Sequence, residues 1–164
     1  MTSTAPKNRI TLHRDFQGTL AEVWDLWTTK DGIESWWGPD GFRVEVRSLD
    51  LRPGGELRYG MIAVAPEMVE FMKKNGMPTV SETLIRYREI VQQARLAYVN
   101  VVDFVPGVTA YDVDTVVELS ATPQGVRLRL TLDPMHDDVW TQRATMGWEM
   151  ELGKLGRLLA ARAS

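Results

Sequence analysis

The carboxyl-terminal stretch of the chain, residues 138–162, reads DVWTQRATMGWEMELGKLGRLLAAR. Its large apolar side chains, from Trp140 through Trp148 to Leu155, recur every three or four residues, which is the spacing of one helix face. A helix of this length extends for roughly 36 Å, at about 1.5 Å per residue. We therefore predict one long helix that crosses an entire sheet.

The residues before this helix alternate apolar and polar side chains, the period of a half-buried strand. The predicted strands are Ile10–Phe16, Phe42–Arg47, Leu57–Met61, Thr83–Ile90, Leu96–Phe104, Tyr111–Ala121 and Val126–Leu132. The connections RPGG at 52–55 and TPQG at 122–125 are short turn sequences. Short connections favour an antiparallel meander.

Three further helices interrupt the strands. Thr19 and Glu22 have the spacing of a capping box, which predicts a helix that ends near Thr28. One more helical turn is predicted over Ile33–Trp37, before the turn sequence GPDG at 38–41. Apolar residues at i, i+3 and i+4 predict a third short helix over Pro66–Asn75.

These elements define the predicted fold class as α+β. A curved antiparallel sheet of about seven strands wraps around the long carboxyl-terminal helix. Two short helices lie between strands one and two, and an extra short helix is inserted between strands three and four. We expect a single domain over residues 9–162, with residues 1–8 as a disordered tail.

Composition excludes several classes of function. The 164 residues include no cysteine and two histidines, so we expect no metal and no cofactor. The formal net charge is −3 and no basic block is present, so we expect no nucleic-acid partner. No apolar run approaches the roughly 20 residues of a membrane span, and the first eight residues are polar, so we expect a cytoplasmic protein.

Five motifs in order carry a resemblance to a known family. They are VWDLWT at 23–28, WWGPDGF at 36–42, RPGG at 52–55, YREI at 87–90 and GW at 147–148. Over roughly residues 9 to 162 the chain resembles the activator of heat-shock protein 90 ATPase homologue-like branch of the START-related (SRPBCC) superfamily. The resemblance implies a helix-grip fold of the START and Bet v 1 type, with an apolar cavity between the sheet and the carboxyl-terminal helix.

From this geometry we expect the protein to bind a small, mostly apolar molecule, a lipid or another hydrophobic ligand, in that cavity. The residues expected to line it are Trp24, Tyr59, Met61, Tyr87, Tyr98, Asn100, Thr115, Val117, Leu128, Leu130, Ala144 and Trp148. In the competing interpretation, the side chains of Trp148, Met146 and Met150 fill the space between the sheet and the helix.

Arg14 has two interpretations. On the inner face of its strand it needs a carboxylate or an anionic group of the ligand, which makes it a candidate ligand-binding residue. With the strand shifted by one residue it is a solvated side chain. Adjacent Trp36 and Trp37 are not expected to face inward together, so we expect them to anchor a strand edge.

Other functions stay open. The resemblance allows a module that contacts a chaperone and stimulates its ATPase, and also a polyketide cyclase or dehydratase, although no catalytic residues are identified. A cyclase needs an acid and a base in the cavity, for which Tyr98, Asn100 and Arg14 are the candidates. The apolar side of helix 66–75 fits a lid over the cavity, a homodimer contact or packing on the sheet edge.

Overall fold

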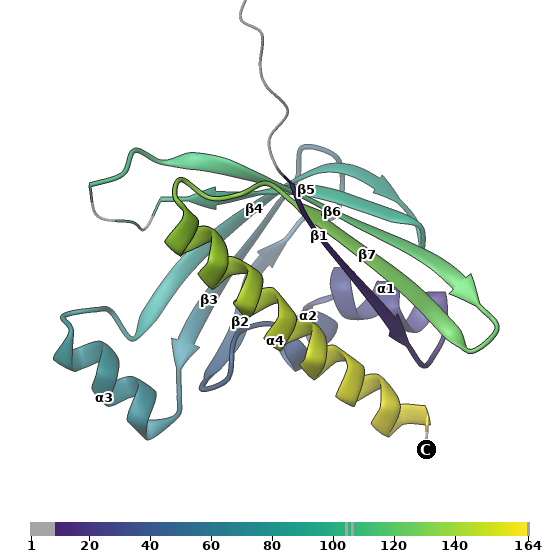
Figure 1. Ribbon diagram of the computed structural model, residues 1–164, viewed down its shortest axis with the longest axis horizontal. Coiled ribbons are helices and arrows are strands. Elements are labelled where there is room, and N and C mark those ends of the chain that lie inside the picture. The colour runs from purple at the N-terminus through teal and green to yellow at the C-terminus, as the bar shows by residue number, and fades with distance from the viewer. Residues whose placement is uncertain (1–8, 104, 106, 164) are drawn as a thin grey trace, which may run out of the picture.

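Residues 9–103, 105 and 107–163 are described by a computed structural model of the chain. Seven antiparallel strands form one sheet in the order β1-β7-β6-β5-β4-β3-β2 (Figure 1). The strands are β1 (Ile10–Phe16), β2 (Phe42–Leu49), β3 (Glu56–Ala63), β4 (Val80–Val91), β5 (Arg95–Val102), β6 (Tyr111–Thr122) and β7 (Gly125–Leu132). All neighbours along the chain except β1 and β2 pair directly, which is the predicted meander.

The sheet curves, and its curvature has local causes. The register shifts between Val46 and Ser48 in the β2–β3 pair and between Tyr87 and Glu89 in the β4–β5 pair. Such irregularities bend a strand and increase its twist. The concave face that results is apolar, because the inward residues of each strand alternate with charged residues on the convex face.

The long helix α4 (Asp138–Ala163) runs diagonally across the sheet, as Figure 1 shows. Its buried residues are Leu152, Leu155 and Leu159, all in its second half. This half packs beside Phe16 of β1 and near α2. The helix-grip arrangement predicted from the sequence is therefore confirmed.

Helices α1 (Leu20–Thr28) and α2 (Lys30–Trp36) connect β1 to β2. The predicted capping box is present: the Thr19 hydroxyl accepts the Glu22 N–H at 3.1 Å, and the Glu22 carboxylate accepts the Thr19 N–H at 3.1 Å. Helix α2 begins earlier than predicted, because the Thr29 hydroxyl accepts the Gly32 N–H at 3.0 Å and so caps it.

Helix α3 (Pro66–Lys74) is the insertion between β3 and β4, and it lies apart from α4 in Figure 1. Both residues before it are tied to the α2–β2 turn, since the N–H groups of Val64 and Ala65 donate to the Gly41 carbonyl at 2.8 and 3.1 Å. Met72 is buried, whereas Phe71 is 55% exposed. In this structure α3 thus packs beside the sheet and does not cover α4.

Several strand boundaries differ from the prediction by one to three residues, the start of β4 and the end of β5 among them. Strand β4 begins at Val80, three residues earlier, because Val80 and Ser81 extend the pairing with β3. Strand β5 ends at Val102, and Phe104, the predicted end, lies outside the described residues, as does the predicted tail 1–8.

Candidate functional site

A band of polar side chains crosses the middle of the otherwise apolar concave face. Strand pairing places Tyr87 of β4 opposite Tyr98 of β5, and Tyr98 opposite Thr115 of β6. Asn100 follows Tyr98 on the same face of β5 and donates to the Thr115 hydroxyl at 3.1 Å. Tyr59 of β3 continues the band toward the sheet edge. We call Tyr59, Tyr87, Tyr98, Asn100 and Thr115 the polar band.

Two hydroxyls of the polar band are buried without a partner. Tyr87 and Tyr98 are 2% and 1% exposed, and neither phenolic oxygen has a hydrogen-bond partner among the described residues. Their rings meet edge to face with centroids 6.4 Å apart. Buried hydroxyls normally have a hydrogen-bond partner. Two neighbouring hydroxyls without an acceptor therefore either destabilise the folded protein or mark a site where a polar group of a ligand binds.

A carboxylate on α4 faces this band. Glu151 is partly buried, and its Oε1 accepts the Gly38 N–H at 2.7 Å. The Lys154 ammonium, one turn further along α4, donates to the Gly38 carbonyl at 2.7 Å. Together these bonds fasten the middle of α4 to the α2–β2 turn. Gly38 has a φ of +95°, a left-handed conformation that favours glycine.

The environment of Glu151 weakens its charged form. Burial raises the pKa of Glu151 to about 7, against the opposing effects of the Gly38 N–H and of Lys154. Burial, together with the Glu151 charge, also raises the pKa of Tyr59 and Tyr98 above the ordinary tyrosine value. The tyrosines therefore keep their protons at neutral pH and are available as hydrogen-bond donors.

Tryptophans fill the space between the sheet and the middle of α4. Trp148 of α4 stacks on Trp27 of α1 with centroids 5.6 Å apart and planes 14° apart. Trp36 and Trp37 both contact Trp27, at 4.9 and 5.9 Å, and Trp37 meets Tyr59 at 5.4 Å.

The expectation that Trp36 and Trp37 do not face inward together is wrong, since they are 1% and 6% exposed. Trp36 ends α2 and Trp37 lies in the extended backbone after it, so their side chains diverge around Trp27. The indole N–H of Trp36 donates to the Leu26 carbonyl at 2.7 Å. Part of the filled-space interpretation thus holds, although the filling comes from α1 and α2 as well as from Trp148.

The first half of α4 packs loosely. None of the residues 138–151 is buried, and Met146 and Met150 are 61% and 41% exposed, so these methionines do not plug the space. Ala144 and Gly147 are the small residues of this half, and a Cβ added at Gly147 would meet no atom within 4 Å. The helix backbone at Gly147, one turn before Glu151, is therefore not packed against another element on that side.

The twelve residues predicted to line the cavity include the five of the polar band and seven others. Tyr59, Tyr87, Tyr98, Asn100 and Thr115 form the polar band of the concave face. Trp24, Val117, Leu128 and Leu130 belong to one buried cluster that also contains Tyr59, Tyr87 and Tyr98, and the partly buried Trp148 packs against it. Met61 and Ala144 are partly buried.

Arg14 does lie on the same strand face as Leu12 and Phe16, and it is partly buried. It meets no carboxylate within ion-pair distance among the residues that the structure describes, and its guanidinium donates to the His13 carbonyl at 2.7 Å. Arg14 pairs with Leu128 of β7, and this strand separates β1 from β6, the nearest strand of the polar band, so Arg14 is not part of the band.

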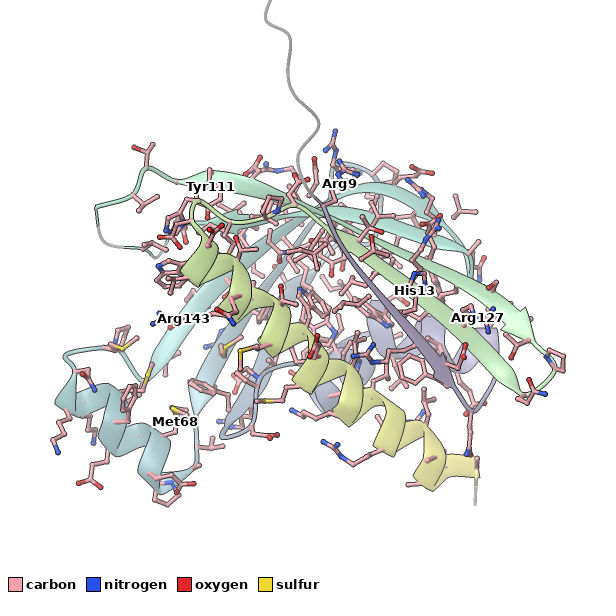
Figure 2. All side chains as sticks on the ribbon, in the orientation of Figure 1. Arg9, His13, Met68, Tyr111, Arg127 and Arg143 are labelled. Carbon is pink, nitrogen blue, oxygen red and sulfur yellow. The ribbon has the colours of Figure 1, made fainter. Side chains whose placement is uncertain are left out.

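The surface also has two hollows away from this space. One, of about 530 Å³, lies between the start of α1 and the β6–β7 hairpin, and another, of about 270 Å³, adjoins Asp15, Gln17 and Arg127. Neither contains a predicted site residue. In Figure 2 the labelled Arg127 lies at this hairpin end, whereas the labelled Tyr111 and Arg143 lie near the start of α4.

Sequence reasoning missed Glu151. Its one available signal is position: Glu151 lies between Trp148 and Leu152, at the border of the apolar stripe of α4. Its partner Gly38 is 113 residues away in the chain, a contact that no local pattern indicates.

Within the described part of the chain, no three His, Asp or Glu side chains converge as they would around a metal ion. No helix in that part has both the length and the apolar character needed to cross a membrane.

A curved antiparallel sheet that holds a long carboxyl-terminal helix over an aromatic interior defines a protein of the helix-grip class. Within that class, the chain belongs to the family described as activator of Hsp90 ATPase homolog 1-like protein, whose model matches residues 17–160. A search of curated proteins finds no match.

Solved structures of bacterial proteins share the fold. A crystal structure from Chromobacterium violaceum has a TM-score of 0.75 and 22% identity, and covers 94% of this chain and 98% of its own. An AHSA1-like protein from Aeromonas hydrophila, solved by NMR, has a TM-score of 0.71, 20% identity and 94% coverage of both chains. At these identities the likeness shows the fold alone.

Proposed function

We propose that this protein binds a small, mostly apolar molecule between the first half of α4 and the polar band of the sheet. The observation that carries the proposal is the pair of buried, unpartnered hydroxyls of Tyr87 and Tyr98 on that face. Pockets of this kind combine apolar walls with a few polar groups that orient the ligand.

The ligand enters by displacing the first half of α4. The Tyr87 and Tyr98 oxygens are sealed from solvent in this structure, so no water-sized space adjoins them. The overlying residues 138–151 include none that is buried, and the open space at Gly147 lies on the same half of the helix. Moving this half costs less packing energy than moving the half that holds Leu152, Leu155 and Leu159.

Binding of the uncharged fluorescent probe N-phenyl-1-naphthylamine tests the proposal. The variant Ala144→Trp fills the space under α4, so we expect it to weaken probe binding at least tenfold. Gln142→Trp adds the same indole on the exposed side of the helix and should leave binding unchanged. Equal affinity of both variants, with thermal unfolding like that of the wild type, would contradict a site under α4.

The other functions compatible with the family gain no specific support from the geometry. No surface feature on the described residues identifies a chaperone contact, and helix α3 is neither a closed lid nor a shown dimer contact. Ligand binding is therefore the function that the arrangement supports best.

A further inference from the structure

The chemistry of the polar band restricts which ligand fits. Tyr87 and Tyr98 are paired across β4 and β5, and their ring centroids are 6.4 Å apart. Both hydroxyls lie on the same face, and both lack an acceptor. By contrast, the Thr115 oxygen accepts a hydrogen bond from the Asn100 amide. Among the described residues of the band, the buried hydroxyls without any hydrogen-bond partner are those of Tyr87 and Tyr98.

We infer that the ligand is an uncharged, mostly apolar molecule with one carbonyl oxygen, such as a ketone or an aldehyde, and that Tyr87 and Tyr98 donate to this oxygen. The inference rests on the proposed function and names its ligand class. A carbonyl oxygen has two lone pairs and can accept from two donors at once. One such atom would satisfy both buried hydroxyls.

The charges around the band disfavour a carboxylate ligand. Glu151 is the acidic group that faces Tyr59 and Tyr98 from α4. The nearby cation is Lys154, which binds the Gly38 carbonyl and faces Glu151. The groups that face Glu151 from the other elements are the Gly38 N–H and neutral tyrosines. An anion at the band would therefore meet a like charge and no available cation, which is unfavourable in a buried site.

Three naphthalene probes of matched shape test this inference by isothermal titration calorimetry at pH 8. In 2-acetylnaphthalene the side group carries a carbonyl oxygen, in 2-isopropenylnaphthalene a CH₂ group replaces that oxygen, and 2-naphthoate carries a carboxylate. We expect the ketone to bind about tenfold or more tightly than the alkene, since two hydrogen bonds distinguish them. The carboxylate should bind most weakly.

The double variant Tyr87→Phe/Tyr98→Phe should bind the ketone no better than the alkene while its affinity for the alkene is retained. Tyr111→Phe is the matched control, because the Tyr111 hydroxyl is bonded to His136 at 2.7 Å outside the polar band. It should keep the preference for the ketone.

The outcomes separate this inference from the proposed function. Equal binding of ketone and alkene, blocked by Ala144→Trp, would overturn the carbonyl inference and leave the binding site in place. Binding that Ala144→Trp does not affect would overturn the proposed function, and with it the inference. Failure of all three probes to bind a protein that still binds N-phenyl-1-naphthylamine, or tightest binding of 2-naphthoate, would overturn the inference alone.

Discussion

At the scale of single residues, the unpartnered hydroxyl of Tyr98 has a consequence for stability. A buried O–H without an acceptor loses its hydration and gains nothing in return. We expect Tyr98→Phe to raise the free energy of unfolding by about 1 kcal/mol in the absence of ligand. Chemical denaturation checks this value. Tyr111→Phe, which removes a bonded hydroxyl, should lower stability, and a comparable loss in both variants would contradict the unpartnered state of Tyr98.

Glu151 makes stability depend on pH near neutrality. Its pKa is about 7 in the folded protein, against an ordinary value of 4.5, so the folded state binds more protons than the unfolded state between these limits. The contribution of Glu151 to the free energy of unfolding is therefore largest at acidic pH and decreases as the pH rises toward 7. The carboxylate remains an acceptor for the Gly38 N–H, which limits the loss.

Glu151→Gln removes this dependence. The amide oxygen can still accept the Gly38 N–H but carries no charge. At pH 8 we expect the variant to exceed the wild type by about 2 kcal/mol, with the difference vanishing near pH 4. Urea unfolding at several pH values measures the difference in the free energy of unfolding between the variant and the wild type. A difference that stays constant across the pH range would exclude Glu151 as the titrating group.

Sequence reasoning at this scale succeeds where side-chain direction follows from strand alternation. Tyr59, Tyr87 and Tyr98, which are expected to line the cavity, are buried on strands that alternate apolar and polar residues. Trp36, Trp37 and Glu151 were not predicted correctly, because their environment depends on how α2 and α4 meet the turn at Gly38, a contact between distant segments.

At the scale of elements, the two halves of α4 should differ in dynamics. The second half contains Leu152, Leu155 and Leu159, whereas residues 138–151 contain no buried side chain. We expect amide hydrogens of residues 142–150 to exchange faster with deuterium than those of 153–161. Saturating 2-acetylnaphthalene should slow exchange in the first half. Uniform exchange along α4, unchanged by the probe, would contradict its role as the movable cover.

Helix α3 offers a second contrast between neighbouring residues. Met72 is buried, and Phe71 is 55% exposed. Met72→Ala should destabilise the protein by about 2 kcal/mol, because it leaves a cavity. Phe71→Ala should change stability by less than about 0.5 kcal/mol. Thermal unfolding compares the two, and a large loss in Phe71→Ala would indicate that this side chain packs against another surface in solution.

The elements themselves were predictable because each has a local signal. The capping box at Thr19 and the apolar stripe of α4 placed their helices closely. The start of β4 was placed late, since Val80 and Ser81 join the strand through pairing with β3 rather than through their own alternation. Pairing partners are a tertiary property, and alternation within one strand does not contain them.

At the scale of the whole molecule, the two halves of α4 differ in packing: the second half contributes leucines to the core, whereas residues 138–151 include none that is buried. Tryptophans from α1, α2 and α4 pack together in the interior, and Trp37 connects them to Tyr59 of the polar band. The resemblance of the sequence to its family implies a space under the helix, but it does not indicate this difference between the two halves. The proposed site lies beside the half that has no buried residue.

The most direct test of the account is the position of a bound probe. Intermolecular NOEs from the aromatic protons of 2-acetylnaphthalene to the assigned protein would locate it. We expect NOEs to the rings of Tyr87 and Tyr98 and to the methyl group of Ala144. Contacts confined to the hollow at the β6–β7 hairpin, or the absence of contacts under α4 at saturating probe, would contradict the account.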